Sequence, residues 1–322
     1  MLNRLLTIAL ELLVLILAPP LLPGIINKTK AWFAGRNGPP VLQVYYDLRR
    51  LWGKGMVISN TTTWLFVTAP WMALGAILLA GLMVPLWPTA APVNFTGDLI
   101  LFVYLLALAR FFTTLAALDT GSSFEGMGVA REIAFAVFSE PALFLVLLVL
   151  VKIVGSGGET GPAGLLTQLN LSSLLFPAGH GFISSRAMAS LVLAAMGLFV
   201  ILLAECSRIP VDDPNTHLEL TMIHEVMILD NSGPLLAAQI YATCVKMLII
   251  ATILIHILVP LDRGLNGQYM NLWIIMLCGL PIIAVVVGIV ESMMARLRMK
   301  LVPTLLVGAC LLGAFGFLLL IG

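Results

Sequence analysis

The stretch that decides the fold is IAFAVFSEPALFLVLLVLVKIV, residues 133–154, in which only Glu140 and Lys152 are charged. An apolar run of about 20 residues is long enough to cross the hydrocarbon core of a bilayer as a helix. The whole chain has a matching composition, since 60% of its 322 residues are hydrophobic and 10% are charged. Soluble proteins carry about a quarter charged residues. The sequence therefore predicts a polytopic integral membrane protein rather than one or two soluble domains.

Seven further apolar runs of comparable length accompany this one. They occupy residues 5–26, 64–87, 99–118, 188–203, 235–259, 272–290 and 301–321. We expect one all-α membrane domain over residues 1–322, with about eight transmembrane helices. The first run contains Glu11 and lacks an A-x-A cleavage site, so we expect a retained span rather than a secretory signal. We expect the run at 188–203 to extend through Glu205.

The positively charged residues predict the orientation of these helices. Lys and Arg gather in the loops after the first, third, fifth and seventh runs, whereas the even loops offer only Arg186 and Arg263. The basic residues of the odd loops are Lys28, Lys30, Arg36, Arg49, Arg50, Lys54, Arg131, Arg208, Arg296, Arg298 and Lys300. Cytoplasmic loops of membrane proteins carry an excess of Lys and Arg. We therefore predict both termini on the outer face and cytoplasmic loops at residues 27–63, 119–132, 206–234 and 291–300.

Charge and cysteine spacing limit the chemistry that the chain can perform. The net charge of +1, from 17 basic and 16 acidic residues, lacks the concentrated basic excess of a nucleic-acid-binding protein. His217 and His224 lack the H-E-x-x-H spacing of zinc proteases. The cysteines are too far apart to form a local metal-binding pair, and they are Cys206, Cys244, Cys278 and Cys310. We expect no cofactor on this chain, so any redox centre belongs to partner subunits.

Acidic side chains lie inside the predicted spans, where they are expensive. Insertion scales assign about 2.5 to 3.5 kcal/mol to each charged residue at the centre of a span, and such residues are usually paired or functional. Glu132 and Glu140 are eight residues apart, which places them about 80° apart around one helix and roughly 12 Å apart along it. They could line a polar track for protons. The alternative is a static ion pair with Arg110, Arg131 or Lys246.

The fifth loop is the most informative stretch, and residues 204–220 read AECSRIPVDDPNTHLEL. Apolar residues interleaved with polar ones over residues 218–229 predict an amphipathic or partly embedded helix. A solvated acidic loop is the alternative. The loop sets five acids against the single basic residue Arg208, although basic residues otherwise collect on this side. The acids are Asp212, Asp213, Glu219, Glu225 and Asp230.

This loop resembles the corresponding loop of the respiratory complex I subunit 1 family, whose pattern is A-E-x-x-R-x-P-x-D-x-P followed by acids and E-L. The matching residues are Ala204-Glu205, Arg208, Pro210, Asp212, Pro214 and Glu219-Leu220. The first loop resembles that family's R-x-G-P…L-Q…D segment through Arg36-Asn37-Gly38-Pro39, Leu42-Gln43 and Asp47. Together with the eight predicted spans, the resemblance covers nearly the whole chain.

Two further segments resemble one branch of that family, the membrane-bound nickel–iron hydrogenases, including formate hydrogenlyase and hydrogenase-4-type enzymes. Residues 118–132 read LDTGSSFEGMGVARE, and residues 291–298 read ESMMARLR. The chain departs from the complex I pattern after Pro214, where Asn215 and His217 replace the usual Glu-x-Glu. The resemblance therefore transfers no glutamate to those two positions.

The resemblance implies two groups of site residues. The ion-translocation group is Glu132, Glu140, Glu205, Asp212 and Glu219, with Glu225 and Glu291 as weaker extensions. The group implied for partner docking or a quinone-like cavity is Arg36, Asp47, Asp119, Arg131, Arg208 and Asp213. The implied partners are soluble hydrogenase large and small subunits, iron–sulfur subunits and antiporter-like membrane subunits. The nickel–iron centre and iron–sulfur clusters would lie in these partners, which would dock on the cytoplasmic loops.

The expected function is that of a membrane anchor and ion-coupling subunit, in a prokaryotic cytoplasmic (inner) membrane, which links a soluble redox arm to proton or sodium translocation. The first alternative is the quinone-chamber subunit of a complex I-type NADH or ferredoxin:quinone oxidoreductase. A stand-alone ion transporter and a purely structural anchor are the others. The electron donor, whether formate, carbon monoxide or ferredoxin, stays open.

Overall fold

The computed structural model describes residues 2–86, 91–155, 169–175, 185–212, 222–259 and 269–321. Within these ranges the regular structure is helical, without a strand, which confirms the predicted all-α class. The helices long and apolar enough to span a membrane are α4 (Trp64–Met83), α5 (Asp98–Asp119), α6 (Ser123–Gly155), α9 (Ser185–Glu205), α11 (Pro234–Leu258), α12 (Tyr269–Met293) and α13 (Val302–Leu318). The 3₁₀ turn η1 (Met299–Leu301) precedes α13.

The first predicted span is broken rather than continuous. Helices α1 (Leu2–Leu17) and α2 (Leu21–Phe33) meet at Pro19-Pro20 with a bend of 46°. A proline has no N–H to donate and clashes with the carbonyl one turn earlier, so two in succession end the helix. Counted as one span, the pair completes the expected eight, and the helical chain continues beyond the predicted end at residue 26 to Phe33.

Two tyrosines satisfy carbonyl groups that the break leaves at the end of α1. The last carbonyls of a helix have no partner within it. The hydroxyl of Tyr241, on α11, donates to the Ile16 carbonyl at 2.8 Å, and the hydroxyl of Tyr45 donates to the Leu17 carbonyl. Tyr45 lies on α3 (Gln43–Trp52), a helix within the first loop. The break is therefore fixed by tertiary contacts to α3 and α11.

Two other boundaries differ from the sequence prediction. Helix α6 has 33 residues and begins at Ser123, so most of the loop expected at 119–132 is helical. A helix of that length rises about 50 Å, which exceeds a hydrocarbon core of about 30 Å. The described part of the amphipathic helix predicted at 218–229 is helical only in α10 (His224–Met227). The extension of α9 to Glu205 is confirmed.

Local packing explains the short α10. The carboxylate of Asp212 accepts hydrogen bonds from the backbone N–H groups of Ile223 at 3.0 Å and His224 at 3.1 Å. These N–H groups therefore do not serve a preceding helical turn. A Cβ at Gly128 would lie 2.2 Å from Val226 Cγ1, so the glycine allows α10 to pack closely on α6. Tertiary contacts thus override the amphipathic pattern here.

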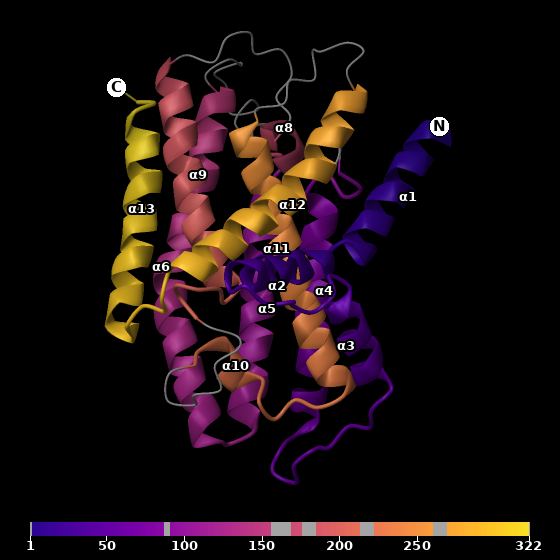
Figure 1. Ribbon diagram of the computed structural model, residues 1–322. Coiled ribbons are helices and arrows are strands. Elements are labelled where there is room, and N and C mark those ends of the chain that lie inside the picture. The colour runs from indigo at the N-terminus through magenta and orange to yellow at the C-terminus, as the bar shows by residue number, and fades with distance from the viewer. Residues whose placement is uncertain are drawn as a thin grey trace.

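Figure 1 shows the arrangement of the helices. The most enclosed long helix is α11, which packs against α4, α9 and α12. Both termini lie at the upper end of the bundle, together with α8 (Leu171–Leu175), whereas α3 and α10 lie toward the lower end. The termini therefore share one end, as an even number of spans requires, and the cytoplasmic position of the other end stays a prediction.

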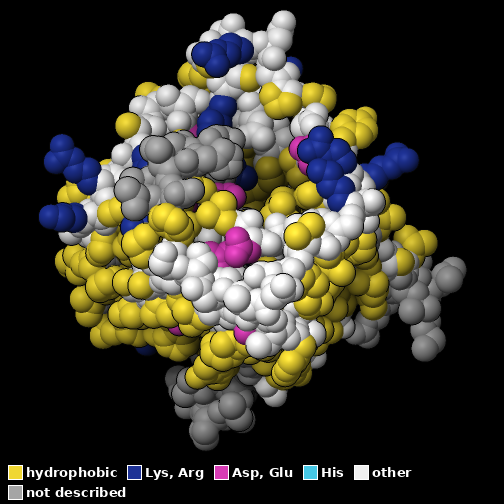
Figure 2. Space-filling view, turned by 90° about the horizontal axis from the view of Figure 1, so that it is seen from below, with side chains coloured by type: hydrophobic (Ala, Val, Ile, Leu, Met, Phe, Trp, Pro, Cys, Tyr) yellow, Lys and Arg dark blue, Asp and Glu magenta, His cyan; other side chains and the backbone are white. Residues whose placement is uncertain are grey.

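The end that carries α3 and α10 is rich in charge. Figure 2 shows Lys and Arg side chains around the rim of this end and Asp and Glu side chains nearer its centre. The exposed basic residues from the α2–α4 segment include Arg49, Arg50 and Lys54. This distribution agrees with the charge asymmetry on which the orientation was predicted.

Candidate functional site

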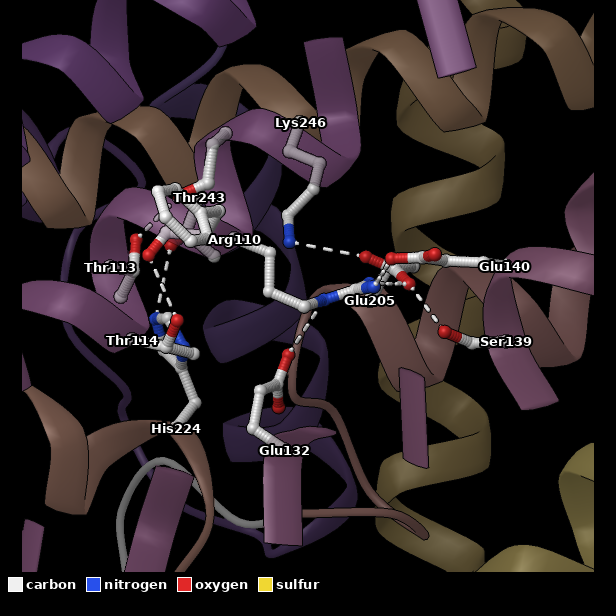
Figure 3. Close-up of polar contacts among 12 residues, drawn as sticks. Arg110, Thr113, Thr114, Glu132, Ser139, Glu140, Glu205, His224, Thr243 and Lys246 are labelled. Atoms are coloured by element: carbon white, nitrogen blue, oxygen red, sulfur yellow. Dashed lines mark hydrogen bonds and ion pairs between the residues drawn. The ribbon is translucent and has the colours of Figure 1, made fainter. Parts of the chain in front are cut away.

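One arginine inside the helix bundle contacts three carboxylates (Figure 3). Arg110 lies midway along α5 and donates from Nε to Glu132 Oε1 at 3.2 Å. Its two terminal nitrogens contact Glu140 and Glu205. Lys246, from α11, pairs with the other oxygen of Glu205 at 3.3 Å. We call these five residues the Arg110 cluster.

The positions of the three acids follow from the helices that carry them. Glu132 and Glu140 both project from α6 toward the guanidinium of Arg110, whose planar fork of donors can serve several oxygens at once. Glu205 is the last residue of α9 and also accepts a hydrogen bond from the Ser139 hydroxyl at 2.8 Å. The cluster therefore ties α5, α6, α9 and α11 together at one level of the bundle.

The cluster contains one more acid than base. With every group ionised, three carboxylates face two cations, so the formal charge is −1. The side chains of Glu205 and Arg110 are only 7% and 10% exposed. Taking charges out of water costs several kcal/mol per ion unless they are paired. A proton or another cation that neutralises the surplus carboxylate is therefore favoured, which is what an exchangeable proton site requires.

The fifth loop sends its next charges to different partners. Arg208 NH1 lies 3.6 Å from Glu291 on α12, and the same carboxylate pairs with Lys30 of α2 at 2.8 Å. Asp212 pairs with Arg296, in the α12–α13 connection, at 2.9 Å. These pairs hold the described part of the loop against α2 and the α12–α13 connection.

A cavity of about 400 Å³, which we call the chamber, lies where α2, α3, α10 and α11 meet. Its apolar wall includes Val44, Ile228 and Met247, and its polar wall includes Asn27, Asp47, Arg208, His224 and Glu225. The chamber can therefore accommodate a small molecule or a segment of a partner, with both apolar and polar contacts.

His224 lies between the chamber and the Arg110 cluster. It lines the chamber and also a small cavity that Arg110, Glu132 and Lys246 line from the other side. Its Nε2 is 3.5 Å from the hydroxyl oxygen of Thr243, as Figure 3 shows. Burial, with a smaller contribution from Lys246, lowers the pKa of the His224 imidazole to about 4. The ring is therefore neutral at pH 7 and can both donate and accept a proton.

This pKa predicts how stability depends on pH. The unfolded imidazole has a pKa of about 6.5, so between pH 6.5 and about 4 the unfolded chain binds more protons than the folded chain. Stability therefore falls as the pH is lowered through this window. We expect His224 to contribute a loss of about 1–2 kcal/mol at pH 5 relative to pH 7. Thermal unfolding of the wild type and His224→Gln in detergent at both pH values measures it. Equal pH dependence of the two proteins would contradict the prediction.

The structure brings together part of the predicted ion-translocation group. Glu132, Glu140 and Glu205 meet at Arg110, and Asp212 lines a small cavity with Glu132 and Glu205. Glu225 lines the chamber, and Glu291 belongs to the separate ion pair with Lys30. Glu219 lies outside the described residues. The single polar track imagined from the sequence is thus divided among the cluster, the chamber and a separate ion pair.

The predicted docking residues are spread over the lower end of the bundle. Asp47 and Arg208 line the chamber. Asp119 accepts a hydrogen bond from the Thr63 backbone N–H at 2.7 Å and ties α4 to α5. Arg131 donates to the Met222 carbonyl at 2.8 Å, and Arg36 is exposed. Asp213 lies outside the described residues.

Sequence reasoning treated Arg110 and Lys246 only as alternative ion-pair partners, and it did not place His224, Ser139 or Thr243 in the site. Arg110 carries a signal in the sequence, because it is the only charged residue within the apolar run at 99–118. The other members have no such signal, since a serine, a threonine or a histidine within or beside a helix more often satisfies a local backbone group.

Fold and site together define the class: a multi-pass membrane protein with a charged cluster inside its helix bundle and a chamber beside it. Residues 6–322 match the NADH dehydrogenase family. The chain therefore belongs to this family, the complex I subunit 1-type proteins, and the predicted resemblance is confirmed.

Known relatives come from both branches of the family. Hydrogenase-4 component C of Escherichia coli is 30% identical over 91% of this chain and 88% of its own length. Formate hydrogenlyase subunit 4 of the same organism is 29% identical over 91% of each chain. An NADH-quinone oxidoreductase subunit of Bordetella avium is 26% identical over 62% of this chain and 57% of its own length. These names support a membrane subunit of a respiratory-type complex.

A solved structure shares the fold. A chain of the membrane-bound sulfane sulfur reductase, an archaeal respiratory membrane complex, superposes with a TM-score of 0.74 and covers 99% of both chains. The sequences are 18% identical, so the comparison concerns the arrangement of the helices.

Proposed function

We propose that this chain is the membrane anchor and ion-coupling subunit of a membrane-bound nickel–iron hydrogenase complex in the prokaryotic cytoplasmic membrane. Soluble hydrogenase and iron–sulfur subunits would dock on the end that carries α3 and α10 and would hold the metal centres. Antiporter-like subunits would lie beside the chain in the membrane. The higher identity and coverage of the hydrogenase-4 and formate hydrogenlyase relatives support this branch over the quinone-linked one.

The observation that carries the coupling role is the position of the Arg110 cluster one residue layer away from the chamber. From the chamber, His224 and Thr243 lead to the small cavity beside Arg110 and Lys246. A second small cavity lies between Glu132, Glu205 and Asp212. Polar side chains and small cavities therefore connect the docking end of the bundle with the cluster.

A change of charge at the docking end would act on the cluster through this connection. In a partly buried setting with an effective dielectric constant of about 20, two unit charges 10 Å apart interact by roughly 1.7 kcal/mol. That is comparable to the 1.4 kcal/mol that changes a proton-binding equilibrium tenfold. A negative charge from the redox arm would favour proton uptake by the surplus carboxylate, and its removal would favour release. The same arithmetic applies to sodium.

Isolation of the native complex tests the assignment. An affinity tag on this chain, introduced in its native organism, should recover a multi-subunit complex that contains a nickel–iron hydrogenase and turns over hydrogen without added quinone. Its other subunits would identify the electron donor, for example a formate dehydrogenase or a carbon monoxide dehydrogenase. A complex that lacks a hydrogenase would contradict the proposal.

The chamber favours one alternative, a quinone-chamber subunit, because a cavity of about 400 Å³ with an apolar wall suits a hydrophobic ring compound. That function predicts turnover that depends on added quinone and stops with a quinone-site inhibitor. A stand-alone ion transporter predicts solute flux by the isolated chain in liposomes, whereas a purely structural anchor predicts unchanged ion coupling when the Arg110 cluster is altered.

A further inference from the structure

Glu140 differs from the other acids of the Arg110 cluster because its side chain is 44% exposed. It lies near the middle of α6, within the apolar run at residues 133–154. Arg110 contacts Oε1 of this carboxylate, and the exposed remainder of the group faces the outside of the bundle. A carboxylate at the middle of a span is costly where it faces hydrocarbon.

The surface around Glu140 is a stripe of large apolar side chains. Ile133, Val137 and Phe144 lie on the same side of α6 as Glu140, since residues three, four and seven apart share a helix face. All three are exposed, and Val137 reaches 62%. We call these four residues the α6 face. The neighbouring α5 exposes Tyr104, Leu108 and Phe111 at a similar spacing.

Another stripe on the protein shows what a face suited to lipid looks like. Helix α9 exposes Met188, Val192 and Met196 with the same four-residue spacing, and Val192 is 57% exposed. This stripe contains no ionisable residue between Met188 and Met196. The two faces are therefore similar in exposure and spacing, and they differ in the carboxylate at the centre of the α6 face.

We propose that the α6 face is buried against a helix of a second membrane-spanning subunit, which presents a hydrogen-bond donor or a cationic side chain to Glu140. Charge complementarity carries this assignment, because the cluster has a surplus carboxylate and Glu140 is its most exposed acid. Polar groups that hydrogen-bond across helices are a common means of association within membranes. The partner would join the cluster to the next subunit and complete its neutralisation.

This inference rests on the proposed membership in a multi-subunit membrane complex, but it does not depend on ion coupling. The test uses the tagged native complex, reconstituted in phosphatidylcholine vesicles, with the exposed Cys278 replaced by Ser. Val137→Cys and, as a matched control, Val192→Cys are each spin-labelled, and collisions with dissolved oxygen report contact with lipid. Hydrogen turnover of the same preparation measures the proposed function separately.

We expect the oxygen collision rate at position 137 to be at least threefold lower than at position 192. Loss of a membrane subunit from the labelled Val137→Cys complex, with the Val192→Cys complex intact, would also support the interface. Equal collision rates at the two positions in an intact complex would show that lipid covers the face and would overturn the proposal, whether or not hydrogen turnover is present.

Glu140→Leu provides a second measurement that needs no label. If a partner donates to Glu140, the variant should lose that membrane subunit during detergent extraction at least several-fold more readily than the wild type. Val192→Leu is the control on the α9 stripe. If lipid covers the α6 face, Leu suits it better than Glu, and full retention of every membrane subunit would overturn the proposal.

Discussion

Glu205→Gln in the assembled complex is expected to lower the number of ions translocated per hydrogen turned over by at least tenfold. Glu205 is the acid of the cluster that contacts both cations, Arg110 and Lys246. With a neutral amide in its place, two carboxylates would balance two cations, and the surplus acid that favours an exchangeable proton would be gone. Proteoliposomes that contain the purified complex allow hydrogen turnover and ion uptake to be measured together.

Glu291→Gln is the matched control. Glu291 is also a buried carboxylate that faces two cations, Lys30 and Arg208, but it lies outside the Arg110 cluster. Its substitution should leave the ratio of ions to hydrogen within about twofold of the wild type, even if it lowers stability by the amount expected for a broken buried ion pair. An unchanged ratio in Glu205→Gln with hydrogen turnover intact would remove the relay role.

The sequence was sufficient for the membrane fold because apolar runs of span length are a strong signal. It also identified Glu132, Glu140 and Glu205, since each charge within or at the end of such a run is conspicuous. It could not show that Glu132 and Glu140, about 80° apart on an ideal helix, would reach the same guanidinium. That outcome depends on how α5 packs beside α6.

The division of the fifth loop was not predictable from the sequence either. Glu205, Arg208 and Asp212 lie close in the chain, yet their partners come from α5, α11, α12 and the α12–α13 connection. Partners that distant in sequence are set by tertiary packing. The same reason explains α10, where the carboxylate of Asp212 binds backbone N–H groups that an amphipathic helix at 218–229 would have used.

Two features on which the sequence prediction was wrong do have a local signal. Pro19-Pro20 lies within the first apolar run, and proline is known to break a helix, so the bend of 46° could have been anticipated. The early start of α6 is harder to predict, because Gly126 and Gly128 are poor helix formers. Close packing of α10 on Gly128 compensates for that weakness.

Arg110→Gln is expected to have the second large effect, on stability and assembly. The substitution would leave three carboxylates with Lys246 as the remaining cation of the cluster. Removing one partner of a buried ion pair costs about 3–5 kcal/mol. That is a large share of the roughly 5–15 kcal/mol by which folded proteins are stable. We expect a lower thermal unfolding temperature in detergent and a several-fold lower yield of assembled complex.

A second substitution separates loss of charge balance from loss of packing. Arg110→Gln combined with Glu132→Gln returns the formal charge of the cluster from −2 to the wild-type −1, while the arginine side chain is still absent. If surplus negative charge is the cause, the double variant should recover at least half of the lost stability. Arg131→Gln is the control, because Arg131 donates to a neutral carbonyl, and its loss should cost about 1 kcal/mol. A double variant no more stable than Arg110→Gln would show that Arg110 acts through its packing, since restoring the charge would then change nothing.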